Sequence, residues 1–356
     1  MLSGLRKKQT YAMIGIDLGS HSVKAIALSK SGKSYKVEGV AEMNVPKGAM
    51  SERQLIEVDK VAQVIKQVKR NFPAKYKFAA SAVSGADVYT RVVQMDADLN
   101  EMELEGQIEL EAEHLIPFPI DEISIDFEVL NKNLADPSRN DVLISAARTD
   151  TIITKASCLE DAGLEPKVMD IESHALGRAC QLVLTEDEQE KVVAAIDIGA
   201  SMMTFAMMNK GETVYARVQN YGGQNYTQAI ANFYSMSLEQ AEKDKLANTL
   251  PADYDSDVLA PFITSAIQHI RRNVQLFCSS SGFSKVDKLV LTGGGSLLPE
   301  LVSQIESELE IPLILANPFT EFSFANSADE KLMAMNGPKY MMALGLALRS
   351  FTPCQI

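Results

Sequence analysis

The chain has 356 residues, 46% of them hydrophobic, and a formal net charge of −13 at pH 7. This length suffices for more than one buried core, so we expect two lobes. The acidic balance argues against nucleic-acid binding, because Lys and Arg supply most of that affinity. No apolar run of 18 or more residues occurs in the sequence, which predicts no transmembrane helix.

Residues 14–28, IGIDLGSHSVKAIAL, are an apolar run that ends in Asp-Leu-Gly, a short polar turn and a second apolar run. The pattern predicts a β-hairpin with Asp17 at the end of its first strand. Successive amides in such a turn can face one anion, and a lysine after it adds positive charge toward phosphate. The candidates for this role are Gly19, Ser20, His21, Ser22 and Lys24.

Residues 88–147 read as an insert made of a strand, a helix and two further strands. Asn100 as N-cap with Glu103 three residues later predicts the start of the helix, and Pro117 its end. Residues 96–113 contain eight acidic residues in eighteen. This acidic helix is either a receptor for a basic partner segment or simply a solvated face, and the sequence leaves both readings open.

Residues 194–208, AAIDIGASMMTFAMM, repeat the hairpin pattern, with Asp197 in the place of Asp17 but without a lysine. Each copy alone is equally consistent with an ordinary hairpin closed by an Asp-x-Gly turn, whereas two matching copies favour a phosphate site between two lobes. The two aspartates suit a Mg²⁺ ion held through water and phosphate oxygens. The phosphate candidates of this copy are Gly199, Ala200 and Ser201.

Residues 286–301, VDKLVLTGGGSLLPEL, predict a strand, three glycines and a helix that starts at Ser296. Three glycines let the backbone pass flat under a planar ring or a ribose, and a helix N-terminus favours phosphate. The nucleotide-binding candidates here are Gly293, Gly294, Gly295 and Ser296.

With these elements the chain resembles the actin-like ATPase superfamily, whose five motifs occur in fixed order. They match residues 14–28, 172–180, 194–208, 289–301 and 340–349. The resemblance implies an α/β fold of two lobes, each with a mixed sheet and helices, and a cleft that binds ATP with Mg²⁺. It also implies that Glu242 and Lys245, in a Glu-x-x-Lys helix, contact adenine and ribose, although such a pair also suits a solvated helical face.

The resemblance leaves slow hydrolysis open. Hydrolysis needs a water in line with the γ-phosphate, and the position of Glu172 at the start of the second motif makes it the candidate that orients this water. Asp170 is the second choice. Both side chains are at least as well explained as structural residues at a strand end and a helix N-terminus.

The position of the insert resembles subdomain 1C of the FtsA-like branch. The phrases EAEHLIPFPIDE at 111–122 and YGGQNYT at 221–227 further resemble the PilM family of type IV pilus assembly proteins. That resemblance implies a cytoplasmic protein held peripherally at the inner membrane by a partner, the N-terminal cytoplasmic tail of PilN, in a groove between subdomains 1A and 1C. We expect groove residues near 88–95 and on the strands after Pro119, with pilus assembly ATPases and the platform protein as further partners.

The N-terminal sequence MLSGLRKKQT lacks an apolar segment, so we expect no signal peptide, and the C-terminal SFTPCQI predicts no amphipathic membrane helix. Two alternatives of the same fold remain: an FtsA-like polymerising ATPase and a small-molecule kinase. The expected subdomains are 1A at 1–87 and 148–192, 1C at 88–147, 2A at 193–230 and 276–350, and 2B at 231–275. Residues 185–191 are expected to be a charged loop.

Overall fold

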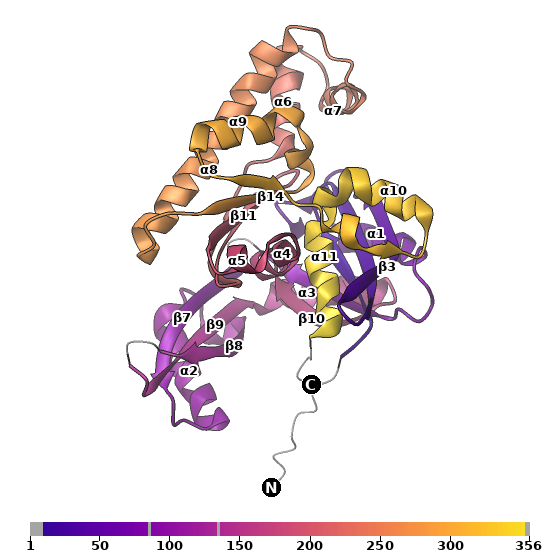
Figure 1. Ribbon diagram of the computed structural model, residues 1–356. Coiled ribbons are helices and arrows are strands. Elements are labelled where there is room, and N and C mark those ends of the chain that lie inside the picture. Colours follow the sequence, from indigo (N-terminus) through magenta and orange to yellow (C-terminus); the bar gives the residue numbers. More distant parts are fainter. Residues whose placement is uncertain (1–9, 85–86, 134–135, 353–356) are drawn as a thin grey trace.

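The computed structural model describes residues 10–84, 87–133 and 136–352. It shows an α/β protein with two lobes, each built around one mixed sheet, and helices between them (Figure 1). A smaller sheet and its helix form a separate unit at the lower left of that view. Our expectations for the N-terminal MLSGLRKKQT and the C-terminal SFTPCQI fall mostly outside the described residues, since residues 1–9 and 353–356 are not among them.

Six strands form the sheet of the first lobe, in the order β10-β6-β1-β2-β3-β16. Every residue of β1 is buried, as expected for a central strand covered on both faces. A two-stranded hairpin, β4 with β5, follows β3. The six strands of the sheet are β1 (Met13–Leu18), β2 (Ser22–Ser31), β3 (Ser34–Asn44), β6 (Phe78–Val83), β10 (Glu165–Ile171) and β16 (Ser323–Phe324), and those of the separate hairpin are β4 (Met50–Ser51) and β5 (Gln54–Leu55). Helices α1 (Val58–Lys69) and α3 (Thr149–Asp161) pack on one face of this sheet.

Five strands form the sheet of the second lobe, in the order β13-β12-β11-β14-β15. They are β11 (Val192–Ile198), β12 (Met203–Asn209), β13 (Glu212–Gln219), β14 (Lys288–Thr292) and β15 (Leu313–Leu315). The helices of this lobe rise above its sheet in Figure 1. They are α6 (Gly223–Phe233), α7 (Leu238–Ala247), α8 (Ala260–Ser281) and α9 (Pro299–Leu309).

Two helices, α4 (Glu172–Cys180) and α11 (Met341–Ala347), lie between the two sheets. One hydrophobic core contains side chains of both helices together with residues of both sheets, such as Met13 and Ala195. The two lobes are therefore joined by one shared core around α4 and α11.

The insert has the predicted order of elements: β7 (Val88–Asp96), α2 (Glu101–Leu115), β8 (Ile123–Lys132) and β9 (Arg139–Arg148). The predicted capping box is confirmed, since the Asn100 side chain accepts from the amide of Glu103 and the Glu103 carboxylate accepts from the amide of Asn100. Leu104, Ile108 and Ala112 are buried against the insert's own sheet. The glutamates of α2 face solvent.

The structure differs from the expected boundaries in three places. Residues 323–324 pair with β3, and α11 packs against β1 and β2, so the end of the described chain belongs to the first lobe rather than to the second. The expected loop at 185–191 contains a short helix, α5 (Glu186–Gln189), because Thr185 and Glu188 form a capping box. Helix α9 begins at Pro299 instead of Ser296, since a residue before proline, here Leu298, stays extended.

Within the part of the chain that the structure describes, no helix combines the length and the apolar character needed to cross a membrane.

Candidate functional site

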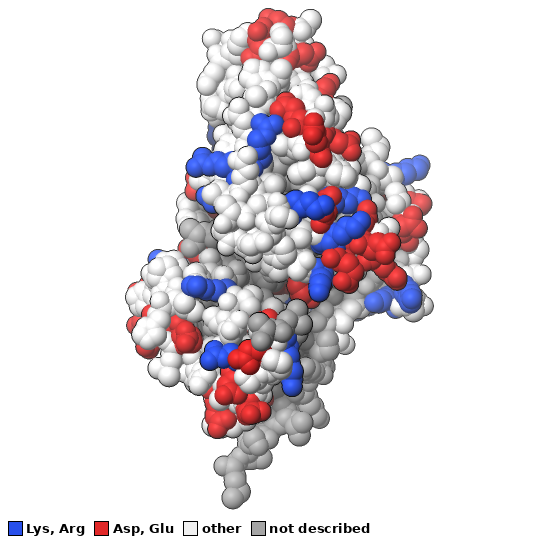
Figure 2. Space-filling model, turned by 60° about the vertical axis from the view of Figure 1, so that its left-hand side comes forward, with Lys and Arg blue, Asp and Glu red and all other residues white. Residues whose placement is uncertain are grey.

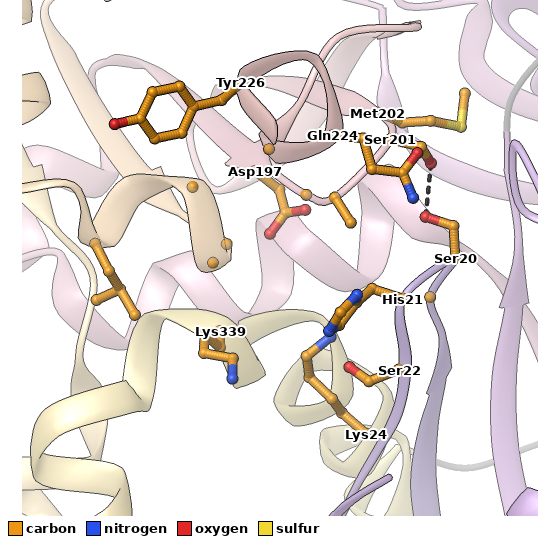
Figure 3. Close-up of a pocket in the computed structure, with 18 of the residues that line it drawn as sticks. Ser20, His21, Ser22, Lys24, Asp197, Ser201, Met202, Gln224, Tyr226 and Lys339 are labelled. Carbon is orange, nitrogen blue, oxygen red and sulfur yellow. Dashed lines mark hydrogen bonds between the residues drawn. The ribbon is translucent and has the colours of Figure 1, made fainter. Parts of the chain in front are cut away.

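The turns of the two similar hairpins, β1–β2 and β11–β12, approach each other across a cleft between the lobes (Figure 3). The hydroxyl oxygens of Ser20 and Ser201 are 2.7 Å apart and share a hydrogen bond that joins the two turns. The cavity behind this contact has a volume of about 380 Å³, a size typical of small-molecule sites. In Figure 3, His21, Lys24, Asp197 and Lys339 surround the same open space.

Most of the residues that the sequence nominated for a nucleotide line this cleft, although they come from distant parts of the chain. The first hairpin contributes its nominated turn residues and lysine, and the second hairpin and the glycine triplet contribute theirs. The residues on the cleft wall are Asp17, Gly19, Ser20, His21, Ser22, Lys24, Asp197, Gly199, Ala200, Ser201, Glu242, Lys245, Gly293, Gly294 and Gly295.

Three nominated residues, Ser296, Glu172 and Asp170, do not line the cleft. Ser296 is buried in the turn after the glycines, and its hydroxyl donates to the carbonyl of Gly293 at 2.7 Å, so it shapes the turn. Glu172 lies behind the cleft wall, where its Oε1 accepts from Nη1 of Arg53 at 2.6 Å. Asp170 is bound to Arg178, with 2.9 Å between Oδ2 and Nη1. In this arrangement neither acidic side chain touches the space where a γ-phosphate would lie.

Positive and negative side chains alternate around the first hairpin. Lys24 Nζ lies 3.6 Å from Asp17 Oδ2, and Arg53 Nη1 donates to Asp17 Oδ1 at 3.1 Å. Burial works against the charge of Arg53, but the carboxylates of Glu172 and Asp17 raise the pKa of Arg53 above its ordinary value. The guanidinium is therefore charged, and it neutralises Asp17 before any ligand arrives.

Asp197 ends β11 as the counterpart of Asp17, but its surroundings are different. Its Oδ1 accepts from the Thr292 hydroxyl at 2.9 Å, at the end of the neighbouring strand β14. Burial raises the pKa of Asp197, because a charged carboxylate loses solvation there. A metal cation near Asp197 would therefore stabilise its charged form.

The opposite end of the cleft is formed by α7 and the glycine triplet. Lys245 Nζ donates to Glu242 Oε2 at 2.6 Å and to the Thr227 hydroxyl at 2.8 Å. Burial alone would raise the pKa of Glu242, but hydrogen bonds from Lys245 and Thr227 hold it below its ordinary value. The pair is therefore an ordered ionic element on the cleft wall and not part of a freely solvated helical face.

Several cleft residues escaped the sequence reasoning. Lys339 Nζ and Glu42 Oε2 form an ion pair at 2.9 Å although the two residues are 297 positions apart. No local sequence pattern predicts this contact. Arg53 likewise stands in an ordinary-looking stretch. The positions of Gln224 and Tyr226 in the cleft could have been predicted from the sequence. Two glycines precede them after the second hairpin, at the start of a helix, and such a pair indicates a close approach of the backbone.

The cleft fits a phosphate chain with a divalent cation. A Cβ on Gly19 would stand 2.9 Å from the carbonyl oxygen of Ser22, and one on Gly199 would stand 3.0 Å from that of Met202, so both tight turns need glycine. Among the described residues, no group of three or more His, Cys, Asp or Glu side chains is arranged to hold a metal ion. A Mg²⁺ site of one or two carboxylates completed by phosphate oxygens and water needs no such group.

Residues 15–351 match the family of the type IV pilus assembly protein PilM. The chain belongs to the PilM family. A solved PilM-PilN type IV pilus biogenesis complex superimposes with a TM-score of 0.82 at 27% identity, and the match covers 97% of this chain and all of that one (100%). The resemblance to this family that the motifs indicated is thereby confirmed.

More distant relatives of this PilM-family chain share its fold. The cell division protein FtsA of Bacillus subtilis (strain 168) is 22% identical over 94% of this chain and 82% of its own length. MreB 5 of Spiroplasma citri, solved with AMPPNP, superimposes with a TM-score of 0.50 at 12% identity, over 95% of each chain. The PilM-family chain thus has the actin-like ATPase fold, as the order of its five motifs predicted.

A second cavity, which we call the edge groove, lies where the insert meets both lobes. Its volume is about 240 Å³. Its walls come from β7 and β13, each the outermost strand of its sheet, and from the start of α4. The edge groove is lined by Ser84, Val88, Tyr89, Thr90, Ile171, Glu172, Ser173, Ala216, Arg217 and Val218.

The edge groove corresponds only partly to our expectation for a partner groove. Val88, Tyr89 and Thr90 fall in the nominated stretch, but no residue of the strands after Pro119 and none of the acidic helix α2 lines it. The hydroxyl of Ser173 is buried there and has no hydrogen-bond partner among the described residues. Figure 2 shows acidic and basic side chains intermixed over the visible face, with a dense acidic group at its right-hand side next to several Lys and Arg residues.

Proposed function

We propose that this chain is an ATP-binding component of the type IV pilus assembly platform, which docks the cytoplasmic N-terminal tail of PilN and links it to the pilus motor. The observation that carries the proposal is the cleft, in which both Asp-Gly hairpins and the glycine triplet meet. Membership of the PilM family supports the pilus assignment. The tail would hold the protein at the cytoplasmic face of the inner membrane.

In this proposal the phosphates lie between the two hairpin turns, where the Ser20–Ser201 hydrogen bond now joins them. Hydroxyls and amides of both turns would then donate to phosphate oxygens instead of to each other. Asp197, with Asp17, would hold Mg²⁺, which supplies positive charge between the phosphates. Adenine and ribose would lie along the glycine triplet, beside Glu242 and Lys245.

For the PilN tail we propose the edge groove. An outermost strand presents unpaired backbone amides and carbonyls, to which an extended peptide can add as a further strand. Here two such strands, β7 and β13, flank one cavity, and the unpartnered hydroxyl of Ser173 offers an additional hydrogen bond. The exposed glutamates of α2 lie outside this cavity, so their part would be to attract a basic segment during encounter.

Thr90→Lys is expected to weaken the binding of a PilN tail peptide by about tenfold or more, because it puts a long charged side chain into the edge groove. The measurement is fluorescence anisotropy with a labelled peptide of the first residues of PilN from the same genome. Val129→Lys is the matched control: Val129 is 44% exposed on β8, at the opposite edge of the insert's sheet and outside the groove. Equal affinities of the two variants for the peptide would rule out the edge groove as the docking site.

A further inference from the structure

Arg53 reaches the cleft from a strained turn. It stands with Glu52 at the tip of the β4–β5 hairpin, and both residues have left-handed backbone conformations, with φ of 47° for Glu52 and 68° for Arg53. Such values are uncommon for residues other than glycine, so the surrounding structure must hold the turn in place. As a result Glu52 faces solvent, whereas Arg53 is only 8% exposed and lines the cleft.

The guanidinium of Arg53 is only partly used by the protein. Nη1 makes both of its hydrogen bonds, to Asp17 at 3.1 Å and to Glu172 at 2.6 Å. Nη2 stands 4.0 Å from the place that a Cβ on Gly199 would occupy, which is beside the second hairpin turn. A guanidinium has five N–H donors in a planar fork, and those of Nε and Nη2 have no hydrogen-bond partner among the described residues, while Nη2 lies beside the second hairpin turn.

We propose that Arg53 is a phosphate-binding residue of the cleft, which neutralises Asp17 and the nucleotide phosphates together and makes nucleotide binding only weakly dependent on Mg²⁺. The inference rests on the proposed ATP cleft and adds a residue to it. An arginine fork suits this role because it binds two phosphate oxygens at once. The tethered cation also competes with a metal for Asp17 and leaves Asp197 as the principal carboxylate for Mg²⁺.

Calorimetry of ATP binding in Mg²⁺ and in EDTA tests this role. For the wild-type protein, replacing Mg²⁺ by EDTA is expected to lower the affinity for ATP by no more than about tenfold. In EDTA, Arg53→Met should bind ATP at least a further tenfold more weakly than the wild type does. Arg139→Met is the matched control, because Arg139 lies at the exposed start of β9, on the insert. This variant should match the wild type in both buffers.

Arg53→Met also leaves Glu172 without its partner, which can weaken the fold. The double variant Arg53→Met/Glu172→Gln removes both charges of the pair, and we expect it to unfold near the wild-type temperature and to show the same loss of affinity in EDTA. The role of Arg53 would be overturned, while the ATP cleft would stand, by either of two results. The first is that Arg53→Met and the double variant bind ATP in EDTA as tightly as the wild type, and the second is that the wild type loses all ATP binding in EDTA. A wild type that binds no ATP in either buffer would overturn the ATP cleft as well.

Discussion

Gly345→Ala is expected to lower the free energy of unfolding by about 4 kcal/mol or more, the range reserved for severe core defects. A Cβ at this position would stand 1.8 Å from the carbonyl oxygen of Ala175, which belongs to the backbone of α4. Neither helix can retreat, because α4 and α11 are packed between the two sheets and share their core. Urea unfolding followed by circular dichroism measures the loss, and a yield of soluble protein near zero would be its extreme form.

Gly106→Ala is the matched control, since Gly106 is also a helical glycine but a Cβ there meets nothing within 4 Å. Alanine is favoured over glycine in a helix interior, so this variant should gain about 0.5–1 kcal/mol. If Gly345→Ala were as stable as Gly106→Ala, the close contact between α4 and α11 would be wrong, and with it the account of how the lobes are joined.

Asp197→Ala is expected to weaken Mg-ATP binding by about tenfold, as the loss of one charged contact to the metal predicts. The carboxylate is buried, and Thr292 holds it at the end of β11, facing the cleft. Asp17→Ala should also weaken binding, but with a smaller dependence on Mg²⁺, because Arg53 and Lys24 already neutralise Asp17. Calorimetric titration with ATP in the presence of Mg²⁺ measures both effects.

Asp126→Ala serves as the control for these two variants, because Asp126 is exposed on β8 of the insert and does not line the cleft. Its affinity for Mg-ATP should equal that of the wild type. Unchanged affinity in both Asp17→Ala and Asp197→Ala would remove the two-hairpin site and leave the pilus assignment to rest on family membership alone.

The local elements were predictable because their signals lie within a few residues of each other. The two hairpins, the insert's order of elements and the Asn100 capping box follow from hydrophobic periodicity and turn chemistry, which act over one turn or one strand. The small helix at 186–189 could have been predicted in the same way, since Thr185 and Glu188 are spaced as a capping box. The start of α9 likewise follows from Pro299, although the three glycines suggested an earlier start.

The assembly of the cleft depended on contacts between distant residues. Glu42 meets Lys339, and Arg53 meets Glu172, only because the sheets and the two central helices bring these segments together. The same tertiary contacts turned Glu172 away from the cleft and placed residues 323–324 in the first sheet.

By itself, the sequence determined the family, the two-lobed fold and most of the cleft wall, because those residues occur in short motifs whose order is visible in one chain. Only the tertiary structure decided which charges face one another. Electrostatic contacts depend on distances of a few ångströms between residues that are far apart in the chain. The local sequence around Arg53, Glu42 or Lys339 does not predict those distances.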